Sequence, residues 1–105
     1  MATLVINVPF EKTTSENKRS FERTIETGIG DEYAIPSAQV SKLASGSRVI
    51  VLDKSRCKRA EGTLVELIPK SKTNSGMRRY DVRIKDLLAV DYKPEKLGRT
   101  GIAVI

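Results

Sequence analysis

The sequence contains no histidine, no tryptophan and only one cysteine, and these absences limit the chemistry open to the chain. Without histidine, a Ser-His-Asp triad, a Cys-His pair and a histidine-based metal site are all excluded. The single cysteine, Cys57, excludes an internal disulfide and fits a reducing compartment. A lone cysteine without a paired base is rarely a nucleophile. We therefore expect that the chain is not an enzyme and holds no metal or cofactor.

Nucleotide-binding motifs and long apolar runs are also missing. Gly28 and Gly30 lie close together, but neither the full glycine-rich fingerprint nor a Walker lysine accompanies them. No segment reaches the roughly 18 apolar residues that a membrane helix requires. Residues 1–10 lack the basic start of a signal peptide. The sequence therefore predicts a soluble, cytoplasmic protein without a membrane partner.

Aromatic residues are scarce, with three tyrosines and two phenylalanines in 105 residues. Valine, isoleucine and leucine must therefore fill most of the core. A chain of this length typically forms one domain with a modest core, so we expect residues 1–105 to fold as a single domain.

Two apolar segments joined by a basic connection occupy the middle of the chain. Residues 48–52 are apolar on both faces, which predicts a strand buried on both sides or curled into a small barrel. Residues 63–68 form the second apolar segment, and we expect Pro69 to end it because proline cannot donate to a central ladder. The connection, residues 54–61, is long for a hairpin turn, so part of it is expected to extend the strands.

Before these strands, the sequence predicts short elements. A strand is expected at residues 3–8 and a helix within residues 11–28, where Phe21 and Ile25 have helical spacing and Gly28 suits the position after the helix end. A mobile segment that orders only on assembly is the alternative for this region. Residues 28–32 are interpreted as a turn, and residues 37–43 as one or two helical turns.

After the strands, a hydrophilic hairpin loop is expected at residues 69–79. Residues 80–85 alternate cleanly, which predicts a strand. Its inward face would carry Tyr80, Val82 and Ile84, and its outward face, turned to solvent or a ligand, would carry Asp81, Arg83 and Lys85. A further short strand is expected at residues 87–90 and a linker at residues 91–100. The apolar segment 101–105 must pair with another strand, and pairing with the N-terminal strand would close a barrel.

The segments Leu-Ala-Ser-Gly-Ser-Arg-Val-Ile-Val at residues 43–51 and Ala-Glu-Gly-Thr-Leu-Val at residues 60–65 resemble those of PUA-like barrels. That superfamily includes the PUA, ASCH and EVE domains, and the resemblance implies a pseudo-barrel that binds RNA or modified bases. The pattern is shared with SH3-like modules. We therefore expect an α+β, mostly β fold: a small barrel or pseudo-barrel of five to six strands with one or two short helices.

Positive charge is concentrated between Lys54 and Lys85, which carry ten of the nineteen Lys and Arg residues and only three of the thirteen Asp and Glu residues. A focused basic segment favours an anionic partner, and phosphate contact requires such clusters. We predict RNA or DNA binding through eight residues that would lie on one rim if neighbouring hairpin ends cluster: Lys54, Arg56, Lys58, Arg59, Lys70, Lys72, Arg78 and Arg79.

Two alternatives remain open at this point. Tyr33 or Tyr80 could offer a stacking surface for bases, although the alternation around Tyr80 favours a core position. The chain could instead be a self-associating homo-oligomer or a module that binds a small ligand or a protein, with its charge serving solubility.

Overall fold

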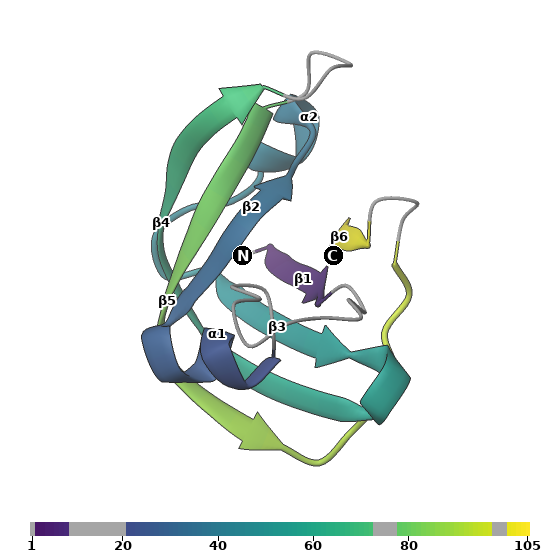
Figure 1. Cartoon of the computed structure of the whole chain (residues 1–105). Coiled ribbons are helices and arrows are strands. Elements are labelled where there is room, and N and C mark those ends of the chain that lie inside the picture. Colours follow the sequence, from purple (N-terminus) through teal and green to yellow (C-terminus); the bar gives the residue numbers. More distant parts are fainter. Residues whose placement is uncertain (1, 9–20, 73–77, 98–100) are drawn as a thin grey trace.

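The computed structural model describes residues 2–8, 21–72, 78–97 and 101–105. Within these residues, six strands form one sheet, with two short α-helices and one 3-10 turn beside it (Figure 1). The strand order is β2-β5-β4-β3-β1-β6, and every neighbouring pair is antiparallel except β1 with β3. The strands are β1 (Thr3–Asn7), β2 (Ile29–Ala34), β3 (Arg48–Asp53), β4 (Lys58–Lys72), β5 (Arg78–Val90) and β6 (Ile102–Val104).

The predicted mostly β fold of five to six strands with one or two short helices is confirmed in the described residues, but the sheet is not closed. The expected pairing of the C-terminal segment with the N-terminal strand is present, since β6 pairs with β1 over Leu4–Ile6. Closure would require β6 to pair with β2, and no such pairing joins the described residues. The relation to PUA-like or SH3-like barrels stays a prediction.

β3 is buried on both faces, as its composition predicts. Val49 and Val51 belong to the main core, which also takes side chains from β1, β2, β4 and β5. Ile50 and Leu52 point to the opposite face, where they form a second, smaller core with Val5 of β1. This strand therefore organises the sheet from its centre.

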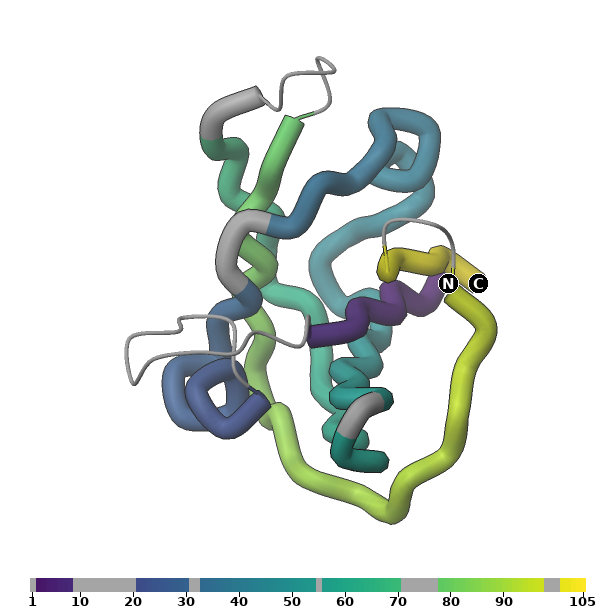
Figure 2. The backbone as a smooth tube through the Cα atoms, turned by 45° about the vertical axis from the view of Figure 1, so that its right-hand side comes forward, coloured from purple at the N-terminus to yellow at the C-terminus, as the bar shows by residue number. Residues whose placement is uncertain are grey.

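The predicted linker after β5 covers the second core. Residues 91–97 have no regular secondary structure and run in an arc from the end of β5 towards β6 (Figure 2). Tyr92 and Leu97 from this segment pack against the second core. The linker is thus part of the packed structure and not only a connection.

β4 continues through Pro69 to Lys72, so the prediction that Pro69 ends the strand is wrong. Pro69 pairs with Tyr80 of β5, whereas the β3 partners of β4 end at Thr63. Beyond that point, within the described residues, β4 has a neighbour on one side only. Proline is tolerated on such an edge because its missing N–H faces away from the ladder.

β5 joins the two strands that were predicted separately at residues 80–85 and 87–90. Asp86 adopts a positive φ of 55°, and the register between β4 and β5 shifts across Glu61 and Thr63. Gly62 makes this bend possible. A Cβ at Gly62 would lie 2.7 Å from Cγ2 of Ile84 and 2.8 Å from the backbone oxygen of Lys85.

The helices agree with the sequence in part. α1 (Phe21–Thr27) packs on the main core through Phe21 and Ile25, and Gly28 follows it with a φ of 72°, as predicted. The earlier part of the expected helix, residues 11–20, lies outside the described residues. α2 (Ser37–Val40) and the turns after it place Val40 and Leu43 against the core, which confirms the prediction for residues 37–43.

The interpretation of residues 28–32 as a turn is wrong, because this segment begins β2. The N–H of Ile84 donates to the carbonyl oxygen of Gly28 at 2.7 Å, and Ile29 and Gly30 pair with β5. A register shift between Gly30 and Tyr33 lets the strand continue past the irregularity. Pairing with β5 therefore overrides the local preference of the glycines for a turn.

Candidate nucleic-acid interface

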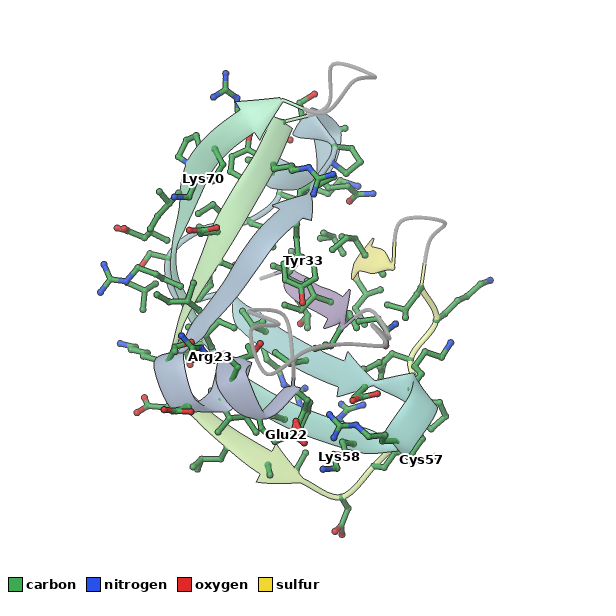
Figure 3. All side chains as sticks on the ribbon, viewed as in Figure 1. Glu22, Arg23, Tyr33, Cys57, Lys58 and Lys70 are labelled. Atoms are coloured by element: carbon green, nitrogen blue, oxygen red, sulfur yellow. The ribbon has the colours of Figure 1, made fainter. Side chains whose placement is uncertain are left out.

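The eight predicted contact residues form two groups at opposite ends of β4. Lys54, Arg56, Lys58 and Arg59 lie at the hairpin between β3 and β4, whereas Lys70 lies near the other end (Figure 3). β4 runs between them, and the twelve steps from Lys58 to Lys70 cover roughly 40 Å of strand path at about 3.3 Å per residue. The expectation that both groups share one rim is therefore wrong. Adjacent hairpins of a meander point in opposite directions.

The hairpin group is largely neutralised by carboxylates of the protein itself. Asp53 caps the 3-10 turn η1 (Lys54–Arg56) by accepting from the backbone N–H of Arg56 at 3.2 Å, and it accepts from Nε of the same residue at 2.7 Å. Glu22 of α1 accepts from Nη1 and Nη2 of Arg56 at 2.5 and 2.7 Å, and from Nζ of Lys58 at 3.1 Å. These hydrogen bonds, chiefly those from Arg56, lower the pKa of Glu22 from 4.5 to about 2.

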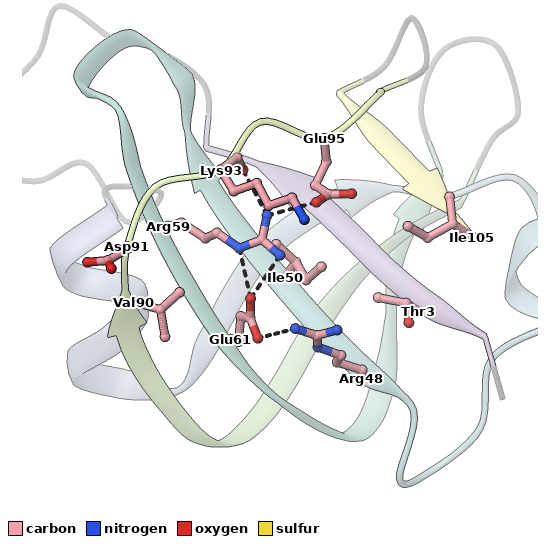
Figure 4. Close-up of a pocket in the computed structure, with 10 residues that line it drawn as sticks. All are labelled: Thr3, Arg48, Ile50, Arg59, Glu61, Val90, Asp91, Lys93, Glu95 and Ile105. Carbon is pink, nitrogen blue, oxygen red and sulfur yellow. Dashed lines mark hydrogen bonds and ion pairs between the residues drawn. The ribbon is translucent and has the colours of Figure 1, made fainter.

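Arg59 is buried, with an exposed fraction of 5%. Its Nε donates to Glu61 at 2.8 Å, and its Nη1 donates to the backbone oxygen of Lys93 and to Glu95, each at 2.8 Å (Figure 4). Burial alone would lower the pKa of Arg59, but the hydrogen bonds to Glu95 and Glu61 outweigh it and raise that pKa. Arg59 therefore fastens the linker to the sheet, and its position does not suit a phosphate contact.

A hollow of about 480 Å³ opens beside this ion network (Figure 4). Arg48 closes the network on that side by pairing with Glu61, and hydrogen bonds from Arg48 and then Arg59 lower the pKa of Glu61. The hollow carries balanced charge, with three cationic and three acidic side chains. Its lining residues are Thr3, Arg48, Ile50, Arg59, Glu61, Val90, Asp91, Lys93, Glu95 and Ile105.

The second group lies on the face of β4 and β5 that is turned away from the main core. Alternation along β5 places Tyr80, Val82 and Ile84 towards the core, as predicted, and the residues between them outward. Arg83 and Lys85 are exposed on this outer face. We use the name arm surface for its cationic side chains together with Arg78 at the end of β5: Lys70, Arg78, Arg79, Arg83 and Lys85.

Two carboxylates accompany the arm surface. Asp81 lies outward as predicted but is buried, because it sits between neighbouring side chains and pairs with Nζ of Lys70 at 3.3 Å. Glu66 pairs with Arg83 at 3.4 Å, and both of these side chains are about half exposed. An exposed pair of this kind is weak, so it leaves Arg83 available to an external anion. The predicted contact Lys72 ends β4, and its side chain lies outside the described residues.

Arg83 and Lys85 were absent from the predicted contact residues, although the clean alternation of residues 80–85 placed them on the outer face. The structure does not bring a tyrosine to that face. Tyr33 has an exposed fraction of 6%, and Tyr80 packs against the main core. Both therefore occupy core positions, as the alternation around Tyr80 favoured.

No protein-family description, curated protein or solved structure matches this chain. Within the described residues, no helix is long and apolar enough to cross a membrane. The same residues contain no group of three or more Cys, Asp or Glu side chains arranged to hold a metal ion.

Proposed function

We propose that this chain is a non-catalytic nucleic-acid-binding domain that contacts the phosphate backbone through the arm surface. The observation that supports it is an excess of accessible positive charge. Among the described residues, the exposed side chains of Arg78 and Lys85 take part in no ion pair, and Arg83 pairs with the half-exposed Glu66. At the hairpin, by contrast, Arg56 and Lys58 share Glu22, and Arg56 also pairs with Asp53. A patch with uncompensated charge attracts a polyanion more strongly than one that is already neutralised.

The kind of contact follows from the residue types. Lysine and arginine side chains on rigid strands bind phosphate oxygens and position the nucleic acid, but they do not by themselves read base sequence. Both described tyrosines near these strands are turned to the core, so base stacking contributes little on this face. We therefore expect binding that depends strongly on salt and weakly on sequence.

Fluorescence anisotropy with labelled duplex DNA and single-stranded RNA tests this proposal. If four or five phosphates are neutralised, affinity for duplex DNA falls roughly 150- to 500-fold between 50 and 200 mM salt. The double variant Arg83→Gln/Lys85→Gln should weaken binding roughly tenfold at 50 mM salt and reduce the slope of log K against log salt by about 2.

A charge-matched control separates the arm surface from net charge. Lys54 and Lys96 are exposed and lie on other elements, at the hairpin and in the linker. Lys54→Gln/Lys96→Gln removes the same charge and should change affinity less than threefold. Equal losses in the two double variants would show that net charge, and not the arm surface, determines binding.

Self-association is a second candidate function, supported by three exposed apolar side chains: Leu88, Val90 and Ile105, at 68%, 43% and 63% exposure. Leu88 and Val90 lie on the same face of β5 and two residues apart. Light scattering over a concentration series checks this candidate. A mass that rises with concentration and returns to the monomer value in Leu88→Lys would support it, and a constant monomer mass would contradict it.

A further inference from the structure

We propose that Arg56 and Lys58 form a second phosphate-binding site, which the carboxylate of Glu22 occupies in the free protein. The inference deepens the proposed nucleic-acid binding and rests on it. Once a phosphate displaces the carboxylate of Glu22, Arg56 and Lys58 would contact the nucleic acid in addition to the arm surface.

The guanidinium of Arg56 is held in place from behind. Asp53, with an exposed fraction of 4%, accepts from Nε of Arg56 at 2.7 Å and also from the backbone N–H of Arg56. This leaves Nη1 and Nη2 directed together at one external acceptor. A fixed pair of N–H donors is the arrangement that binds carboxylates and phosphates through two parallel hydrogen bonds.

Glu22 fills that position as an external anion would. Its two oxygens accept from Nη1 and Nη2 of Arg56, and Oε1 also accepts from Nζ of Lys58. Figure 3 shows Glu22 and Lys58 close together where α1 faces the hairpin. Three donors on one carboxylate make a site whose chemistry equally suits two oxygens of a phosphodiester.

The carboxylate can leave without unfolding the helix. α1 is anchored to the main core by Phe21 and Ile25, and Thr24 is buried, so its attachment does not depend on Glu22. The Glu22 side chain is 53% exposed, and rotation about its own bonds would carry it into solvent. Exposed ion pairs are weak, so a phosphate of a nucleic acid can compete with Glu22 for these donors.

Glu22→Gln should therefore strengthen binding of labelled duplex DNA about fivefold at 50 mM salt, because the tethered competitor is lost. The matched control is Glu26→Gln, on the same helix. Glu26 is exposed, and no ion pair joins it to another described residue. This control should change affinity less than twofold. A third protein, Glu22→Gln combined with Arg56→Gln and Lys58→Gln, should lose the gain.

The outcomes separate this inference from the proposed function. Equal affinities for Glu22→Gln and Glu26→Gln, with Arg83→Gln/Lys85→Gln still binding more weakly, would overturn the proposed site at Arg56 and Lys58 and leave the arm surface supported. If Glu22→Gln binds more tightly and adding Arg83→Gln/Lys85→Gln does not weaken that binding, the site at Arg56 and Lys58 is supported and the arm surface is contradicted. Absence of binding by every variant at 50 mM salt would overturn both.

Discussion

Replacing Arg59 by methionine tests whether this buried residue stabilises the fold by holding residues 91–97 against the sheet. Methionine keeps most of the aliphatic volume but removes the hydrogen bonds to Glu61, Glu95 and the Lys93 carbonyl. Breaking a fully buried ion pair costs about 3 to 5 kcal/mol. Glu61 and Glu95 keep side-chain exposures of 26% and 18%, so water partly solvates them after the loss, and we expect about 2 to 3 kcal/mol.

A change of this size lowers the melting temperature by roughly 10 to 20 °C in a domain of about 100 residues. Thermal and urea unfolding followed by circular dichroism measure it. Arg83→Met is the control, because it removes an exposed pair and should cost less than about 1 kcal/mol. Faster tryptic cleavage at Lys93 and Lys96 should accompany the Arg59 variant, since the linker loses its attachment. Equal melting temperatures in the two variants would refute the structural role of Arg59.

Two further predictions concern stability. Gly62→Ala should destabilise the fold by about 1 to 2 kcal/mol, because the new Cβ would clash with Ile84 and with the backbone oxygen of Lys85 in β5. A urea unfolding midpoint equal to that of the unchanged protein would contradict this prediction. Glu22 has a folded pKa of about 2 against an ordinary 4.5, so its contribution to stability is present above pH 4.5 and is lost as the pH falls towards 2. Solvent screening limits that contribution to about 0.5 to 1 kcal/mol. The difference in unfolding free energy between the unchanged protein and Glu22→Gln should therefore shrink as the pH falls from 4.5 towards 2. A difference that stays constant over this pH range would contradict the prediction.

The strands at the centre of the chain could be predicted from the sequence because their pattern is local. β3 is apolar at every position from Val49 to Leu52, and this composition already required burial on both faces. The strand at residues 80–85 was equally visible in its alternation. Its outward cations, Arg83 and Lys85, could have been added to the predicted contacts on the same ground.

Features that depend on distant partners could not be predicted in this way. Arg59 stands in a run of basic residues, and its burial depends on Glu95, which is 36 residues away. β2 contains one glycine and two acidic residues and follows directly on Gly28, and only its pairing with β5 makes it a strand. The separation of the two cationic groups follows from the length of β4, which the sequence could not show because Pro69 predicted an earlier end of this strand.

The most direct test of the central claim is the salt dependence of binding in Arg83→Gln/Lys85→Gln compared with Lys54→Gln/Lys96→Gln. If the arm surface contacts the phosphate backbone, the first variant loses about two units of slope in log K against log salt, and the second keeps nearly the slope of the unchanged protein. Identical slopes in all three proteins, or no binding at 50 mM salt, would contradict the proposed interface.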